Sequence, residues 1–411
     1  ESPIVGVHSL PAPDRHPVNA DAPFREAGLR RRRRPSSPRS TNGWWRSAPD
    51  TMNLMHPHDA EPLDGVVGTD AHPSNASPRP RSRRWARVLG VTAAAIGAPT
   101  LFFTLSPWPG TRIIRWIFNR DSAKVTAALE RHAPDGVDSI TDEAYRADDP
   151  QARLDVYFPA AAEGALPTVI WTHGGAWISG RKSDFSGYYR LLASRGYTVV
   201  SLDYSLGPEA TYPTAVRQLN EAHAHLLAHA ERLRVEPGSI VLAGDSAGAQ
   251  LTSQLATAIT RPAYADELGI VPSLKANQLA GVILNCGIYD LNALSSAPGV
   301  IGWGIEESLW AYTGVRDVAR SDAAAQMSTL NHVTGDFPAT FISGGNGDPL
   351  TDVQSKPLAK RLTELGVDVD TLFFSASHRP KLGHEYQFDL DVDDGKLAFE
   401  RTVDFVAAHT T

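Results

Sequence analysis

Short apolar runs alternate with longer helical segments from about residue 140 to the end of the chain. The runs are rich in Val, Ile, Leu and Phe, which tend to stand on consecutive rather than alternate positions. Strands that are buried on both faces have this pattern, and they occur in parallel sheets covered by helices. The runs are 154–157, 168–171, 198–202, 240–243, 281–284, 339–342 and 371–374. The helical candidates between them are 185–195, 212–233, 247–260, 353–365 and 396–409. The sequence therefore predicts a three-layer α/β domain with a mainly parallel central sheet.

The first 84 residues differ in composition from the rest of the chain. They hold 13 of the 30 prolines, several Arg and Ser clusters and no sustained hydrophobic period. We predict that 1–84 is a disordered basic segment. Residues 1–87 carry 14 Lys or Arg against 9 Asp or Glu, whereas the remainder carries 25 against 37. This acidic balance disfavours nucleic-acid binding by the main body, because such binding requires cations that neutralise phosphates.

Residues 88–111 contain no charged side chain and are mostly apolar. A segment of this length can span a bilayer, and the arginines before it would keep the N-terminus in the cytoplasm. We expect a membrane anchor or signal segment over 85–111, with the main domain on the outer side of the membrane or secreted. Pro99 and the arginines that follow the segment favour the alternative of a membrane-surface or buried helix, which would allow a cytoplasmic location.

Cys286 is the only cysteine of the chain. An internal disulfide and a cysteine-based zinc site are therefore excluded. Cys286 stands in an apolar run, which is typical of a small buried core residue rather than of a reactive thiol.

A glycine-flanked serine stands between one predicted strand and the helix that follows it. Ser246 lies in the pentapeptide Gly-Asp-Ser-Ala-Gly at 244–248, directly after the run 240–243. Glycines two residues to either side let the strand and the helix approach closely, while the turn holds the serine in strained dihedrals. The N-terminus of the following helix favours developing negative charge. The pattern indicates a nucleophile, and the alternative is an ordinary turn with Ser246 as a helix cap.

A second glycine turn follows the run 168–171. It reads His-Gly-Gly-Ala-Trp at 173–177. The glycines let the N–H groups of Gly174 and Gly175 point into the site, where they and the N–H of Ala247 can bind the oxyanion of a tetrahedral intermediate. We interpret His173 as a residue that holds this loop rather than as a metal ligand or a base.

A nucleophilic serine needs an imidazole to take its proton and a carboxylate to orient that imidazole. In strand-turn-helix sites of this kind the acid and then the base follow the serine along the chain. Asp348 follows the run 339–342 and is our candidate acid, whereas Asp352 is better placed to cap the next helix. His384 is our candidate base, because a glycine precedes it and a helical segment follows. His378 is the alternative, and we expect it to be an exposed loop residue.

Together these motifs resemble the hormone-sensitive-lipase-like esterases, the fold-3 group of α/β-hydrolases. The matching pieces are 154–157, 173–177, 203–209, 212–213, 244–248, 348–350 and 383–384. The resemblance implies an α/β-hydrolase fold with small cap elements and a carboxylesterase that uses no metal or cofactor. The implied catalytic triad is Ser246, Asp348 and His384, and the implied oxyanion donors are Gly174, Gly175 and Ala247.

Three residues depart from the usual pattern of that group. Ala176 stands where many members have a third glycine, Ser205 replaces an arginine, and Glu385 replaces the glycine that commonly follows the histidine. The segment 177–180 also resembles prenylcysteine methylesterases and feruloyl-esterase-like enzymes. These differences do not change the predicted triad, but they affect which subfamily of these esterases the chain resembles most.

The expected organisation is a linker with cap helices over 112–143 and a catalytic domain over 144–411. The stretch 292–334 is too long for a simple connection and carries Trp303, Trp310 and Tyr312. It predicts a cap or substrate-pocket insertion, with packing of a helix pair as the alternative.

We expect this domain to hydrolyse small-molecule or lipid esters through an acyl-enzyme. Amide, lactone or formamide hydrolysis on the same triad is the first alternative. A membrane-tethered binding protein on the same scaffold is the second, because a fold does not dictate a function.

Overall fold

The central sheet of the described chain has eight strands in the order β1-β2-β4-β3-β5-β6-β7-β8. The computed structural model describes residues 102–294 and 299–410. The strands are β1 (Val137–Ala144), β2 (Arg153–Pro159), β3 (Leu166–Thr172), β4 (Thr198–Leu202), β5 (Val235–Asp245), β6 (Leu279–Asn285), β7 (Thr340–Gly344) and β8 (Val369–Phe373). Neighbouring strands from β4 to β8 pair in parallel, and β2 pairs antiparallel with both β1 and β4. Each of the seven apolar runs lies in one of the strands β2 to β8 or overlaps it, so the predicted, mainly parallel sheet is confirmed.

All of strand β1 except Ala144 lies inside 112–143, for which the sequence predicted only a linker and helices. Its sequence, Val-Asp-Ser-Ile-Thr-Asp-Glu-Ala, mixes charged and apolar residues, and its side chains are exposed or half-buried. It pairs only with β2, at the edge of the sheet. Only Val137 and Ile140 of β1 pack against the core clusters, so this edge strand has no run of apolar residues that would indicate it.

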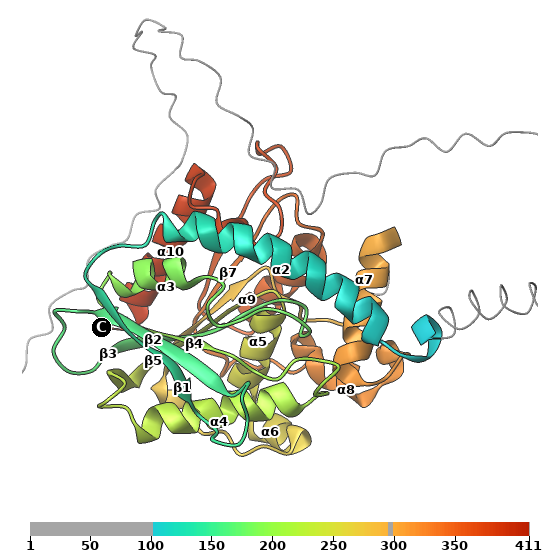
Figure 1. The fold of residues 1–411 in the computed structure, drawn as a ribbon, viewed down its shortest axis with the longest axis horizontal. Coiled ribbons are helices and arrows are strands. Elements are labelled where there is room, and N and C mark those ends of the chain that lie inside the picture. The colour runs from blue at the N-terminus through green and yellow to red at the C-terminus, as the bar shows by residue number, and fades with distance from the viewer. Residues whose placement is uncertain (1–101, 295–298, 411) are drawn as a thin grey trace, which may run out of the picture. The chain divides into compact units, whose positions relative to one another are not determined.

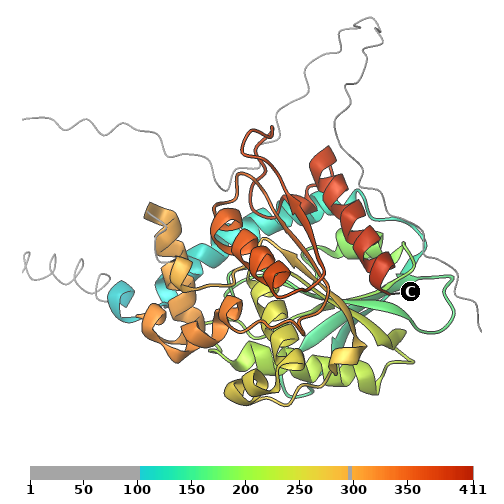
Figure 2. The same cartoon turned by 180° about the vertical axis from the view of Figure 1, so that it is seen from behind.

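Helices cover both faces of the sheet, as Figures 1 and 2 show. They are α2 (Trp108–Glu130), α3 (Ser186–Ala193), α4 (Thr214–Ala228), α5 (Ala247–Thr260), α6 (Pro262–Leu268), α7 (Gly299–Thr313), α8 (Asp322–Met327), α9 (Lys356–Glu364) and α10 (Asp393–His409). Buried side chains of α4, α5, α6 and α9 share one core cluster with Ile170 and Leu242, and those of α3 and α10 share another with Val169 and Val241. Successive strand residues thus face opposite layers, and the three-layer prediction is confirmed.

Two of these helices, α7 and α8, lie in the predicted insertion 292–334. Tyr312 of α7 is 1% exposed and stacks on Trp177, with ring centroids 5.4 Å apart. Trp303 is 37% exposed. The side chain of Tyr312 therefore packs in the core. This is the alternative that the sequence offered to a role in a pocket wall.

Helix α2 is attached to the domain by Arg115. Its guanidinium donates to the carbonyl oxygens of Ile178 and Gly207, the latter at 2.6 Å, and pairs with Glu209. Ile114 on the same helix packs against Ile178 and Ala311. Helix α2 therefore contacts the segment that directly follows the glycine turn at 173–177.

The predicted segments 1–84 and 85–111 lie outside the described residues except for 102–111. Within that part, Gly110 and Thr111 belong to the first turns of α2 and are buried. Among residues 102–294 and 299–410, no helix combines the length and the apolar character that crossing a bilayer requires.

We predict that Arg115→Ala lowers the free energy of unfolding by about 1–3 kcal/mol, because two carbonyl groups and one carboxylate lose their donor. Urea denaturation with linear extrapolation measures the change. Arg112→Ala is the matched control on the exposed face of α2, where we expect a change within about 0.5 kcal/mol. Equal values for the two variants would contradict the role given to Arg115.

Candidate active site

Ser246 occupies the sharp turn between β5 and α5. Its backbone has φ 51° and ψ −120°, a conformation that non-glycine residues rarely adopt. A Cβ on Gly248 would lie 2.0 Å from the carbonyl oxygen of Thr172, and one on Gly244 would lie 2.6 Å from the backbone of Gly248. Both glycines are therefore required by the close approach of β3, β5 and α5.

The structure brings Ser246, Asp348 and His384 together from three loops at the carboxyl ends of β5, β7 and β8. Nε2 of His384 lies 2.9 Å from Oγ of Ser246, and Nδ1 lies 2.9 Å from Oδ2 of Asp348. The other oxygen of Asp348 accepts the N–H of Leu350 at 2.9 Å. This geometry lets His384 take a proton from Ser246 while Asp348 fixes the tautomer of the ring.

The alternative base, His378, and the alternative acid, Asp352, both contact other residues. Nε2 of His378 lies 3.0 Å from Oδ2 of Asp394, and Asp352 pairs with Lys356 one helical turn away. Neither residue contacts Ser246.

Burial and the carboxylate of Asp348 act in opposite directions on the pKa of His384. Burial disfavours the imidazolium, whereas Asp348 favours it, and the pKa of His384 is held above its ordinary value of 6.5. The neutral base therefore predominates only at pH values above this raised pKa.

Cys286 lies beside this pair. Its thiol is fully buried, and burial raises its pKa to about 11, so it is neutral near neutral pH. Cys286, Asp348 and His384 form the one cluster of possible metal-ligand atoms in the described chain, all within 4.8 Å of one another. Both ring nitrogens of His384 already have partners, so a metal ion there would have to displace the serine or the aspartate.

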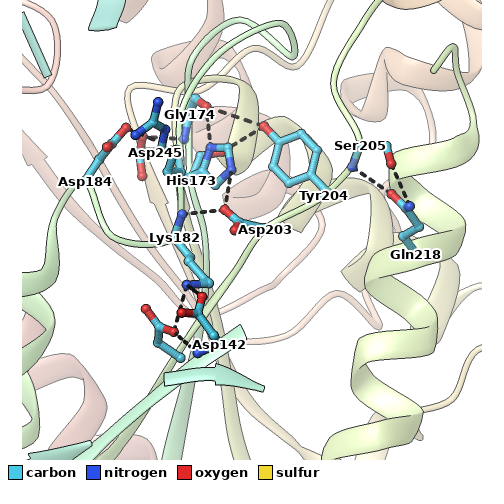
Figure 3. Close-up of polar contacts among 12 residues, drawn as sticks. Asp142, His173, Gly174, Lys182, Asp184, Asp203, Tyr204, Ser205, Gln218 and Asp245 are labelled. Atoms are coloured by element: carbon cyan, nitrogen blue, oxygen red, sulfur yellow. Dashed lines mark hydrogen bonds and ion pairs between the residues drawn. The ribbon is translucent and has the colours of Figure 1, made fainter. Parts of the chain in front are cut away.

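The glycine turn at 173–177 lies directly beside Ser246. Gly175, Ala176 and Trp177 all have positive φ, at 98°, 52° and 58°. The ring of His173 stacks on Tyr204 with centroids 4.5 Å apart, and its Nδ1 donates to the carbonyl of Gly174 at 2.7 Å. Figure 3 shows these contacts, which hold the loop as we predicted for His173.

The predicted oxyanion donors differ in their hydrogen bonds. The N–H of Gly174 donates to Oδ2 of Asp245 at 2.8 Å. The N–H groups of Gly175 and Ala247 have no hydrogen-bond partner among the described residues. The N–H groups of Gly175 and Ala247 can therefore donate to a new oxyanion without first breaking a hydrogen bond.

A charged cluster that the sequence did not reveal lies beneath this loop. The N–H of Lys182 donates to Oδ1 of Asp203 at 2.6 Å, and its Nζ lies 2.8 Å from Asp142 and 2.9 Å from Asp155. Burial opposes the charge of Lys182, but the two aspartates hold its pKa above the ordinary value. Figure 3 shows this cluster between the edge of the sheet and His173.

Asp245 is a second residue that the pattern left undefined, because the position before the serine admits any residue. It is fully buried and accepts the indole N–H of Trp171 at 2.7 Å as well as the N–H of Gly174. Burial raises the pKa of Asp245 well above its ordinary value, and the nearby Glu385 raises it further.

A family model, BD-FAE, matches residues 154–362, which include Ser246 and Asp348. The chain belongs to the BD-FAE family. This is a family of α/β-hydrolase esterases. The BD-FAE match ends before His384, so the histidine is placed by the structure rather than by the family model.

Solved structures share the fold of this BD-FAE chain. Esterase B from Lactobacillus rhamnosis is 24% identical, with 74% of this chain and 96% of that chain covered and a TM-score of 0.63. A bacterial heroin esterase is 22% identical, with 72% and 91% covered and a TM-score of 0.57. An esterase from Pyrobaculum calidifontis is 20% identical, with 73% and 94% covered and a TM-score of 0.56. The α/β-hydrolase fold is thereby confirmed.

We predict that an alkyl fluorophosphonate labels Ser246 and that His384→Ala slows labelling by about 10³-fold or more, because the serine loses its base. His378→Ala is the matched control and should leave the rate unchanged. Mass spectrometry of the labelled peptide over time measures both rates. Slow labelling in the His378 variant alone would reverse the assignment of the base.

Proposed function

We propose that this protein is a serine carboxylesterase. The observation that supports the proposal most directly is the continuous chain of short contacts from Ser246 through His384 to Asp348. His384 removes the proton of Ser246 as the serine attacks the ester carbonyl. The same histidine then gives that proton to the departing alkoxide, which leaves as an alcohol.

An oxyanion hole is the second part of the proposal. The N–H groups of Gly175 and Ala247 stabilise the negative charge that develops on the carbonyl oxygen, and Gly174 contributes if Asp245 releases its N–H. Water, activated by His384, then hydrolyses the acyl-enzyme and restores the serine. The solved structures that share the fold carry the name esterase, which agrees with this chemistry.

We predict that Ser246→Ala lowers kcat on a short-chain p-nitrophenyl ester by about 10⁴-fold or more, because no acyl-enzyme can form. Ser377→Ala, at an exposed loop position, is the control and should keep full activity. Near-normal turnover in the Ser246 variant would exclude the proposal. A series of esters from acetyl to palmitoyl, with the matching anilides, separates an esterase from a lipase and from an amidase.

We also propose that the domain works at a membrane surface, next to the apolar segment 88–111. On α2, Trp108, Arg112, Trp116 and Arg120 stand four residues apart, on one side of the helix. Arg112 lies 5.9 Å from the ring centroid of Trp108, and Arg120 lies 5.8 Å from that of Trp116. Exposed tryptophan beside arginine suits the headgroup region of an anionic membrane.

Several apolar side chains near the start of this helix are also exposed. They are Phe102, Phe103, Leu105, Trp108, Ile113 and Trp116, with exposed fractions from 37% to 71%. Four of them belong to the apolar segment 88–111, and this favours a lipid surface over a water-soluble partner.

We predict that the full chain sediments with vesicles that contain phosphatidylglycerol. The double variant Trp108→Ala, Trp116→Ala should bind about tenfold more weakly, because both interfacial anchors are lost. Val271→Ala, which removes an exposed apolar side chain elsewhere, should bind like the parent chain. A parent chain that stays in the supernatant would contradict the membrane proposal.

A further inference from the structure

Two fully buried glutamines stand on α5, the helix that begins directly after Ser246. Gln250 and Gln254 are both 0% exposed, and Leu251 and Leu255 of the same helix belong to the hydrophobic core. Burying an amide costs free energy unless its hydrogen-bonding groups find partners. A leucine would fill a similar space without that cost, so the two amides need an explanation other than packing.

Gln250 contacts both parts of the proposed site. Its backbone N–H donates to the carbonyl oxygen of Ser246 at 3.2 Å. Its side-chain Oε1 accepts the indole N–H of Trp177 at 3.1 Å. Trp177 ends the glycine turn at 173–177, and Gly175, a proposed oxyanion donor, stands two residues before it. One residue therefore joins the nucleophile to the loop that carries this donor.

The other contacts of Trp177 leave its position incompletely fixed. Its φ of 58° lies in the left-handed region, which an aromatic residue adopts only when its surroundings require it. The indole stacks on Tyr312 of α7 with an angle of 11° between the rings, and its backbone carbonyl accepts the N–H of Gly207 at 2.9 Å. Stacked rings can slide over one another, whereas the hydrogen bond to Gln250 is directional and opposes such a movement.

The hydrogen bonds that continue from Gln250 fix the orientation of its amide. An indole N–H can only donate, so Oε1 of Gln250 faces Trp177 and the NH2 group faces away from it. That NH2 group donates to Oε1 of Gln254 at 3.1 Å and to the carbonyl oxygen of Met327 at 3.2 Å. The NH2 group of Gln254 donates in turn to the hydroxyl of Tyr212 at 2.7 Å. The amide of Gln250 therefore cannot turn over without losing its bonds to three partners.

We propose that Gln250 is a positioning residue: through the indole of Trp177 it sets the place of the N–H of Gly175 relative to Ser246. This role rests on the esterase function proposed above. The negative charge on the carbonyl oxygen develops only after Ser246 has attacked, so a displaced donor affects the tetrahedral intermediate more than the bound ester. Loss of the amide should therefore lower kcat and leave KM nearly unchanged.

The first test is the variant Gln250→Met, which removes the amide at nearly constant side-chain length. We expect kcat on a short-chain p-nitrophenyl ester to fall about 10- to 100-fold, with KM within about threefold of the parent value. Gln254→Met is the matched control, because it removes an equally buried amide of the same helix that does not contact Trp177. Gln250 keeps Met327 as an acceptor in that variant, so kcat should stay within about threefold. Urea denaturation checks that both variants are folded under the assay conditions.

A short-chain trifluoromethyl ketone gives a second measurement that reports on the oxyanion directly. Oγ of Ser246 adds to its carbonyl carbon, the serine proton passes to His384, and the carbonyl oxygen becomes an alkoxide that the oxyanion donors bind. Its inhibition constant should rise in Gln250→Met by about the factor by which kcat falls. In Gln254→Met it should stay within about threefold of the parent value. A purely structural role would lower the stability of both variants without this difference between them.

The partner variant Trp177→Phe removes the indole donor and keeps an aromatic ring for the stack on Tyr312. It should by itself lower kcat about tenfold or more at nearly unchanged KM, which keeps the role of Gln250 testable if Gln250→Met does not fold. The two changes break the same hydrogen bond. The double variant should therefore have a kcat within about threefold of the less active single variant.

Three outcomes overturn the role proposed for Gln250 and leave the esterase proposal standing. They are losses that multiply in the double variant, equal losses of kcat in Gln250→Met and Gln254→Met, and an unchanged kcat in Gln250→Met or in Trp177→Phe. A parent enzyme that hydrolyses no ester and is not labelled at Ser246 overturns the esterase proposal itself.

Discussion

The contact between Gly248 and the end of β3 is the constraint on which the rest of the site depends. A Cβ at Gly248 would lie 2.0 Å from the carbonyl oxygen of Thr172, so only glycine lets α5 start this close to the sheet. Because Thr172 leads into the glycine turn at 173–177 and Gly248 follows Ser246, one backbone contact places both parts of the proposed site. The parallel pairing of β3 with β5, up to Thr172 and Gly244, holds them at the same height.

The strained backbone of the glycine turn at 173–177 is stabilised by contacts with neighbouring loops rather than by its own sequence. Ala176 and Trp177 have positive φ without being glycine, which costs free energy. Tyr204 donates to the carbonyl of His173 at 3.0 Å, and the buried Lys182 binds Asp203 through its backbone. These contacts come from the loops after β3 and β4, so the layers of the fold and the shape of the loop are stabilised together.

The sequence predicted the parallel sheet because fully buried strands need consecutive apolar residues, and seven runs had them. It predicted Ser246, Asp348 and His384 because chain order and local glycines restrict where such residues can stand, and the structure brings the three together. It could not predict that Lys182 pairs with Asp142 and Asp155. These contacts join segments far apart in the chain, and no local pattern indicates them. Strand β1 was not predicted because its side chains are exposed or half-buried and form no apolar run.

The place of the α7 and α8 insertion has an evolutionary consequence. It enters and leaves the domain between β6 and β7, whose parallel register runs without irregularity from Val282 and Thr340 to Asn285 and Ser343. Strand β7 leads to Asp348 and is joined through β6 to β5, which ends directly before Ser246, so the sheet and not the connection between β6 and β7 fixes these two residues. Mutation and selection can lengthen, shorten or replace that connection. The range of substrates can thereby change while Ser246 and Asp348 keep their positions.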